Sequence, residues 1–195
     1  MTTRVICADP PWAFSDSLPG KSRGASKSYR CLPLHEIMRF PLPDLADNCV
    51  LFLWRVSAMQ EEALQVVRAW GFKPHSEMVW VKLTVTGKKS FGMGRIVRGA
   101  HETCIIAVRG RNVPESRRER SVFEAPIGEH SAKPEQFYDI VERMFPGPYA
   151  ELFARRQRDG WSCFGDELPN TCPADVTMLG SSDDVGQGLN GERLV

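Results

Sequence analysis

The sequence predicts an α/β fold in which a mostly parallel sheet carries helices on both faces. Short apolar runs alternate along the chain with segments that repeat at helical spacing. The run at 49–54 is continuously apolar, which suits a strand buried on both faces. The 195 residues, of which 42% are hydrophobic and 25% charged, are enough for one domain with a substantial core.

The first half of the chain predicts two strands and a helix. The strands are expected at 5–8 and 49–54, and the helix at 57–71. Ser57 is the candidate cap at the start of this helix, and Gly71 ends it. An apolar stripe at helical spacing supports the helix: Met59, Ala63, Val66, Val67 and Trp70.

The second half predicts three further strands and a second helix. The strands are expected at 77–82, 103–108 and 150–156, the last of these ending the fold. A helix is expected at 133–147, because Pro134 suits a first helical turn and the stripe comprises Phe137, Ile140, Val141 and Met144. Trp80 is predicted to be core, whereas Trp54, at a strand end, suits either the core or a site.

Four stretches lie outside this pattern. The segments 15–29 and 84–99 are basic and rich in Gly and Ser, and 109–121 is a run of mixed charge. The tail 169–195 has few large apolar residues, so we expect it to be loosely attached or disordered. One domain is therefore predicted at 1–168.

Composition narrows the class of protein. A formal net charge of +1 gives no global signal for a polyanion, so a nucleic-acid surface must come from local clusters of cations. The six cysteines have no C-x-x-C spacing, which indicates neither a zinc site nor a redox motif and suits reduced thiols of the cytoplasm. With no signal peptide and no membrane span, we expect a cytoplasmic protein without a metal.

The predicted strand at 5–8 ends on the sequence Asp9-Pro10-Pro11-Trp12. Ligands of open α/β sheets bind at the carboxyl ends of strands. The two prolines fix the backbone and remove two N–H groups, which leaves a rigid turn with a carboxylate, carbonyl acceptors and an aromatic face. Asp9 and the Pro10 carbonyl could accept the two protons of an exocyclic amine while Trp12 stacks on its ring. The alternative is an ordinary turn with Trp12 in the core.

The stretch "ADPPW" resembles the signature of the MT-A70 family of S-adenosylmethionine-dependent adenine N6-methyltransferases. Further likeness occurs in the family's order over roughly residues 4–168, in "SYRCLPLHEI", "LFLW", "GFKPHSEMVWVK", "GRIVRGAHETCIIAVRG", "EAPIGEHSAKPEQFYDIVERMFPGPYAELFAR" and "GWSCFGDEL". The resemblance implies a Rossmann-like class I methyltransferase fold in circularly permuted order, with the catalytic motif before the cofactor-binding strand.

The resemblance also implies a site. Lys133 would pair with the carboxylate of the cofactor's methionine part, Arg155 to Gln157 would approach its adenosine, and Asp166 would hold its ribose although many relatives have Asn there. The cofactor set is Ala8, Asp9, Lys133, Phe153, Arg155, Arg156, Gln157, Gly165, Asp166 and Glu167. The catalytic set is Asp9, Pro10, Pro11 and Trp12.

The substrate side is expected to involve a tyrosine beside the target base, Tyr29, and basic loops. Phosphate contact is predicted for at least one of Lys21, Arg23 and Lys27. Arg95 or Arg98 is a candidate to position the substrate, and the alternative for these loops is that they are only solvated. His101 and Glu102 follow the second basic loop, and Glu102 is a candidate to hold that loop through a salt bridge.

We therefore predict transfer of a methyl group from S-adenosylmethionine to the N6 amine of adenine in DNA, by a monomer or a homodimer. DNA is favoured over RNA by the small size of the chain. The alternatives are an RNA adenine N6-methyltransferase and a non-catalytic nucleic-acid-binding subunit of the same fold.

Overall fold

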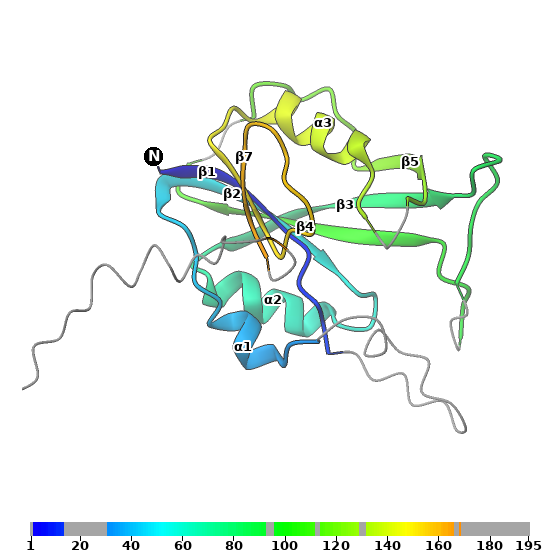
Figure 1. Cartoon of the computed structure of the whole chain (residues 1–195), viewed down its shortest axis with the longest axis horizontal. Helices are drawn as coiled ribbons and strands as arrows, with labels where there is room; N and C mark the ends of the chain where they lie inside the picture. The colour runs from blue at the N-terminus through cyan, green and yellow to red at the C-terminus, as the bar shows by residue number, and fades with distance from the viewer. Residues whose placement is uncertain are drawn as a thin grey trace, which may run out of the picture.

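One seven-stranded sheet organises the chain (Figure 1). The computed structural model describes residues 2–13, 31–92, 96–111, 114–128, 132–165 and 168. Their elements, in chain order, are β1 (Thr3–Ala8), α1 (Leu34–Met38), β2 (Leu45–Arg55), α2 (Gln60–Ala69), β3 (Lys73–Leu83), β4 (His101–Arg109), β5 (Val122–Pro126), α3 (Glu135–Met144), β6 (Tyr149–Leu152) and β7 (Trp161–Phe164). The strand order in the sheet is β5-β3-β4-β2-β1-β6-β7.

The sheet is mixed. Strand β1 pairs in parallel with β2 and β6, β6 with β7, and β3 with β5. Strand β4 runs antiparallel to both of its neighbours, β2 and β3. Antiparallel neighbours need no helical crossover, and β3 and β4 follow each other in the chain without one. The predicted α/β class is confirmed, with this one reversed strand that the sequence did not indicate.

Helices cover both faces of the sheet, and each face has its own core (Figure 1). Strand β2 shows why, because successive side chains of a strand point to opposite faces. Its Phe52 and Trp54 join the core under α3, whereas Leu51 and Leu53 join the core under α1 and α2. Trp80 is 1% exposed within the α3-side core, which confirms its prediction as a core residue.

Several predicted bounds change. Helix α2 begins at Gln60 and its N-cap is Met59, so Ser57 does not cap it. Gly71 follows the helix with a φ of +80°, the left-handed conformation expected of a glycine that ends a helix. The predicted final strand ends at Leu152, and Phe153 has a φ of +61° that breaks strand geometry. Helix α1 and strands β5 and β7 are additional elements, each of five residues or fewer.

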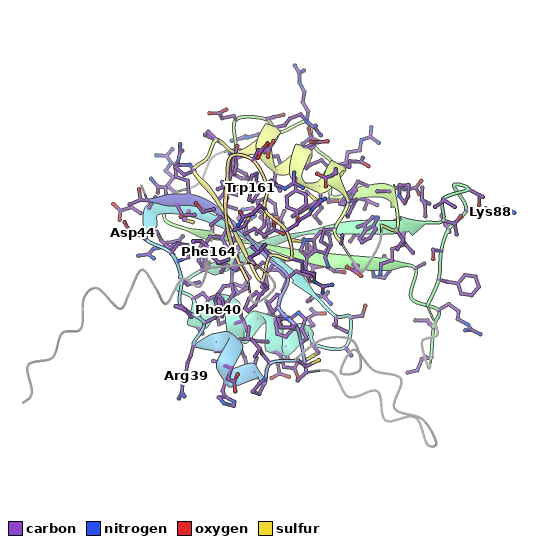
Figure 2. All side chains as sticks on the ribbon, viewed as in Figure 1. Arg39, Phe40, Asp44, Lys88, Trp161 and Phe164 are labelled. Atoms are coloured by element: carbon purple, nitrogen blue, oxygen red, sulfur yellow. The ribbon has the colours of Figure 1, made fainter. Side chains whose placement is uncertain are left out.

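Between β3 and β4 the chain forms a projecting arm, defined here as residues 84–92 and 96–100 (Figure 1). The side chain of Lys88 lies far out on it, away from the packed side chains (Figure 2). Val85, Phe91, Ile96 and Val97 on the arm are between 65% and 97% exposed.

The register brings functional candidates to one edge of the sheet. Ala8 of β1 lies opposite both Leu53 of β2 and Leu152 of β6, so the carboxyl ends of these three strands lie side by side. Because β4 is reversed, its first residues also lie at this edge, with His101 opposite Val81 of β3. The segments that follow Ala8, Leu53 and Leu152 therefore meet the start of β4.

None of the helices in the described residues is long and apolar enough to cross a membrane. The five cysteines within these residues form no disulfide, and no cluster of three metal-ligating side chains occurs among the residues described. The predicted tail 169–195 lies outside the described residues.

Candidate functional site

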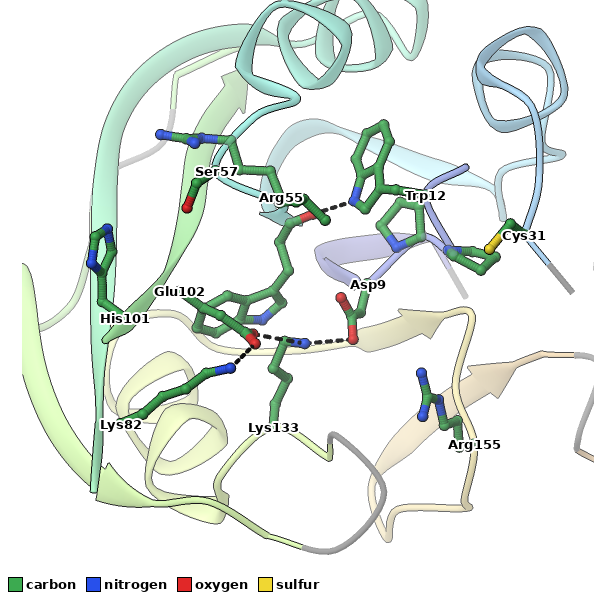
Figure 3. Close-up of a pocket in the computed structure, with 14 residues that line it drawn as sticks. Asp9, Trp12, Cys31, Arg55, Ser57, Lys82, His101, Glu102, Lys133 and Arg155 are labelled. Atoms are coloured by element: carbon green, nitrogen blue, oxygen red, sulfur yellow. Dashed lines mark hydrogen bonds and ion pairs between the residues drawn. The ribbon is translucent and has the colours of Figure 1, made fainter. Parts of the chain in front are cut away.

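A pocket of about 330 Å³ lies at the sheet edge where these strand ends meet (Figure 3). That volume is at the lower end of the range for small-molecule sites. The turn 9–12 after β1, the segment 54–57 at the end of β2, and Lys82 of β3 contribute to its walls. His101 and Glu102 of β4 and three separate side chains complete them: Cys31, Lys133 and Arg155.

Four alternating charges form the centre of the pocket. The Lys133 ammonium donates to Asp9 Oδ2 at 2.5 Å and lies 3.2 Å from Glu102 Oε2. The other carboxylate oxygen of Glu102 pairs with Lys82. The side chain of Lys133 is only 7% exposed, so the two carboxylates supply the compensation that a buried cation requires. Figure 3 shows Lys133 between Asp9 and Glu102.

These contacts keep the central groups ionised. Burial by itself would lower the pKa of Lys133, but the carboxylates of Asp9 and Glu102 outweigh burial and raise this pKa above its ordinary value. Burial would likewise raise the pKa of Glu102, and the ammonium groups of Lys133 and Lys82 outweigh it and lower this pKa. Both side chains are therefore charged at neutral pH.

Two tryptophans support the lysines of this centre. The Lys133 ammonium lies 5.2 Å from the ring centroid of Trp54, and the Lys82 ammonium lies 5.3 Å from that of Trp80. Within the described residues the buried indole Nε1 of Trp54 has no hydrogen-bond partner. Trp54 thus belongs both to the core and to the pocket wall, which the sequence left open.

The Pro-Pro-Trp turn is held from within the protein. The Trp12 amide donates to the Pro10 carbonyl at 2.8 Å, and the Leu32 amide donates to the Pro11 carbonyl at 2.8 Å. The Trp12 indole donates to the Trp54 carbonyl at 3.1 Å. Trp12 lines the pocket, yet it is 4% exposed and packs in the core under α1 and α2.

The prediction that Trp12 offers an open aromatic face is therefore wrong. Strand β1 ends inside the molecule, so a residue four positions beyond Ala8 still lies over the core. The Pro10 carbonyl is also partly committed, because it accepts the Trp12 amide. A carbonyl has two lone pairs, so one acceptor position on it remains.

The segment after β6 supplies Arg155. Phe153, whose φ is +61°, turns the chain out of the strand and packs its ring 4.3 Å from that of Phe40. A left-handed conformation costs a non-glycine residue of order 1–3 kcal/mol and is concentrated at functional sites. Two residues on, Arg155 lines the pocket. Arg156 instead pairs with Glu135 at the start of α3, outside the pocket wall.

Among the described residues, the remaining cofactor candidates do not belong to the pocket wall. Ala8 is buried at the end of β1, and Gln157 is exposed. A Cβ on Gly165 would clash with the Ala154 carbonyl oxygen, so this glycine is explained by the close approach of two chain segments. Asp166 and Glu167 lie outside the described residues.

Of the predicted substrate residues that the structure describes, some line the pocket and Arg98 does not. His101 and Glu102 line the pocket, and Glu102 forms salt bridges with Lys82 of β3 and with Lys133 before α3. Neither lysine belongs to the basic loop 84–99 that Glu102 was predicted to hold. Arg98 lies on the arm, 5.8 Å from the ring centroid of Phe91. Tyr29, Lys21, Arg23, Lys27 and Arg95 lie outside the described residues.

Sequence reasoning missed Lys82 and Arg55, which also line the pocket. Lys82 ends one predicted strand and Arg55 directly follows another, and this position at the carboxyl end of a strand was the signal that could have identified them. With β4 antiparallel, the ends of β2 and β3 meet its start.

The arrangement offers a carboxylate acceptor at a strand end, held in place by a buried cation. It can therefore bind a group with N–H donors at Asp9 and an anionic group at the cationic side chains around it. A carboxylate and cations in one pocket suit a zwitterionic ligand that is bound next to the amine of a second molecule.

The chain matches one family model and several known proteins. The family model MT-A70 matches residues 3–167. The chain is 29% identical over 189 residues to the type II methyltransferase M.MunI of a Mycoplasma species, covering 86% of this chain and 78% of that protein. It is 28% identical over 172 residues to the human N(6)-adenosine-methyltransferase catalytic subunit METTL3, covering 84% of this chain and 28% of METTL3.

A further match is a putative MT-A70-like N(6)-adenosine-methyltransferase of Medicago truncatula. The identity is 28% over 169 residues, covering 84% of this chain and 26% of the plant protein. The chain thus spans about a quarter of the length of the plant and human relatives it matches.

Proposed function

Because the chain belongs to the MT-A70 family, we propose that it transfers a methyl group from S-adenosylmethionine to the N6 amine of adenine in a nucleic acid. The observation that carries this proposal is the Asp9 carboxylate, which directly follows β1, lines the pocket and is held at 2.5 Å by the Lys133 ammonium. We assign this activity to residues 1–168.

The side chains of the pocket suit S-adenosylmethionine. Its methionine part carries an ammonium and a carboxylate, and the pocket has the Asp9 carboxylate for the first and the cations of Lys133 and Arg155 for the second. The Lys133 ammonium has three donors, of which Asp9 and Glu102 take two. When bound, the cofactor supplies a methyl group that its sulfonium already activates.

The chain's own residues would act on the amine of the target adenine. Its lone pair is delocalised into the ring, so the amine is a weak nucleophile. Asp9 would accept one of its protons in a hydrogen bond, and the remaining acceptor position of the Pro10 carbonyl would accept the other. These acceptors would stabilise the positive charge that develops on the nitrogen. Pro11 and the buried Trp12 would keep the turn rigid, so that alignment is set before substrate binds.

The order of these parts along the chain supports a circularly permuted class I methyltransferase fold. The acidic turn follows β1, the first strand, whereas Arg155 follows β6, near the end of the described residues. The two meet because β1 and β6 are neighbours in the sheet.

For the nucleic acid we propose DNA. The chain covers 78% of the type II methyltransferase M.MunI, but only 28% of METTL3, whose name specifies adenosine, a ribonucleoside. RNA remains the alternative because the matches to both kinds of relative have similar identity. A non-catalytic subunit of the same fold is disfavoured by the Asp9–Lys133 pair in the pocket.

The test is incubation with radiolabelled S-adenosylmethionine and separate pools of single-stranded DNA, duplex DNA, single-stranded RNA and duplex RNA. Labelled N6-methyldeoxyadenosine in a digested DNA pool is the expected result. Labelled N6-methyladenosine from the RNA pools alone would show that the substrate is RNA and not DNA. Absence of label from every pool, by a protein that binds the cofactor, would overturn the proposed activity.

A further inference from the structure

The pocket has a second polar side, away from Arg155. Figure 3 shows Ser57 and His101 on the opposite side of Asp9 and Lys133 from Arg155. Arg55, at the end of β2, belongs with them. This inference rests on the proposed function, in which Arg155 lies on the cofactor side and leaves the opposite side for the nucleic acid.

Strand alternation separates this side from the charged centre. Glu102 is paired with Trp80, whose side chain lies in the α3-side core, so Glu102 points to that face. His101 is one residue away on β4 and points to the α2 side. On β2, Trp54 joins the α3-side core, so the next residue, Arg55, also points to the α2 side.

Arg55 is unusually buried for an arginine. Its side chain is 8% exposed, and its Nε is a buried donor that has no hydrogen-bond partner among the described residues. Its guanidinium reaches across β4 to Glu77 Oε1 at 3.3 Å, and Glu77 is itself 47% exposed. A long bond to a half-exposed carboxylate compensates a buried guanidinium poorly.

We propose that Arg55, with Ser57 and His101 beside it, binds a phosphodiester group of the nucleic acid next to the target adenine. A guanidinium offers five donors in a planar fork that matches phosphate oxygens, so a phosphate in the pocket would give the Arg55 cation a second anionic partner besides Glu77. The Ser57 hydroxyl and a ring nitrogen of His101, both exposed at the pocket, are further donors for the same anion.

The test compares Arg55→Met and Arg55→Lys with Glu77→Gln as matched control. Binding of a DNA oligonucleotide is measured against salt concentration, without cofactor. Arg55→Met should weaken binding roughly tenfold and reduce the slope of log K against log salt by about 0.7–0.9. Arg55→Lys should keep the slope because it keeps the charge, and Glu77→Gln should keep it because Arg55 remains.

A second measurement locates the phosphate. In oligonucleotides that wild type methylates, one phosphate beside the adenine is replaced by a neutral methylphosphonate, on the 5′ or the 3′ side. At one of these positions the replacement should lower kcat/KM roughly tenfold for wild type and leave that of Arg55→Met unchanged.

The outcomes separate this inference from the proposed function. An unaltered salt slope in a folded Arg55→Met protein, or equal effects of Arg55→Met and Glu77→Gln, would show that Arg55 only bridges β2 and β3 and would overturn the inference. An Arg55-dependent slope in a protein that methylates no pool would support the phosphate contact and refute the methyltransferase proposal.

Discussion

Replacement of Trp12 distinguishes a structural wall from an open stacking platform. Trp12 is 4% exposed and its indole donates to the Trp54 carbonyl at 3.1 Å. Truncating a buried tryptophan to alanine costs about 3–5 kcal/mol because a large cavity opens. For a chain of this length about 1 kcal/mol lowers Tm by roughly 2–4 °C. We therefore expect Trp12→Ala to lower Tm by roughly 6–20 °C.

Trp70 provides a matched control for this experiment. It is also 4% exposed, lies in the same core, and donates from its indole to the Ile37 carbonyl at 3.1 Å, but it does not line the pocket. Trp12→Phe and Trp70→Phe each lose one indole hydrogen bond worth about 1 kcal/mol, so their Tm values should fall by similar amounts.

Activity should separate the two variants. Thermal unfolding gives Tm, and kcat/KM is measured at a temperature where both proteins are folded. Trp12→Phe should lose roughly tenfold in kcat/KM, since a small displacement of the turn misplaces Asp9, and Trp70→Phe should lose little. A Trp12→Ala protein that melts within a few degrees of wild type would show that Trp12 is not core. Equal activities of the two Phe variants would show that the turn does not need this tryptophan for alignment.

Three further predictions concern charged side chains. Asp9→Ala should lower turnover at least about a hundredfold, because a transition-state hydrogen bond worth roughly 2.7–4 kcal/mol is lost. Circular dichroism should show that the variant keeps its fold. Near-normal methylation would refute the catalytic role of Asp9. A second variant replaces five cations of the loops by alanine: Lys21, Arg23, Lys27, Arg95 and Arg98. The slope of log K for nucleic-acid binding against log salt should fall by about 0.7–0.9 for each of these cations that binds a phosphate in the wild type, and cofactor affinity should not change. The same slope as in the wild type would mean that these loops bind no phosphate. Glu102 has a pKa below its ordinary value of 4.5 in the folded state, so its contribution to stability is complete above about pH 4.5 and is lost as pH falls through the folded-state pKa. Tm measured from pH 7 to pH 3 should therefore fall less steeply in Glu102→Gln than in wild type, and parallel curves would contradict the pairing of Glu102 with the two lysines.

Local patterns in the sequence predicted the main elements. The apolar runs at 5–8 and 49–54 lie in β1 and β2, and the two amphipathic stripes lie in α2 and α3. These elements are recognisable because their pattern repeats over enough residues. Helix α1 and strands β5 and β7 span five residues or fewer, which is too short for a period to stand out.

The sequence also predicted the carboxylate and the lysine of the candidate site, but not how they are joined. Asp9 and Lys133 are 124 residues apart, and their 2.5 Å contact depends on how the start of α3 packs over β1 and β2. Lys82 and Arg55 reach the site because β3 and β2 end at this edge of the sheet, and the reversed direction of β4 brings Glu102 to the same edge.

The sequence by itself therefore determined the elements with a clear local pattern and the residue types at the end of β1, because both depend on neighbours in the chain. Only the tertiary structure decided that Trp12 is buried, that Glu102 bridges two lysines, and that Arg55 points to the opposite face. These outcomes depend on strand direction and register. Direction sets which end of a strand lies at the pocket, and a shift of one residue exchanges the faces to which all side chains of a strand point.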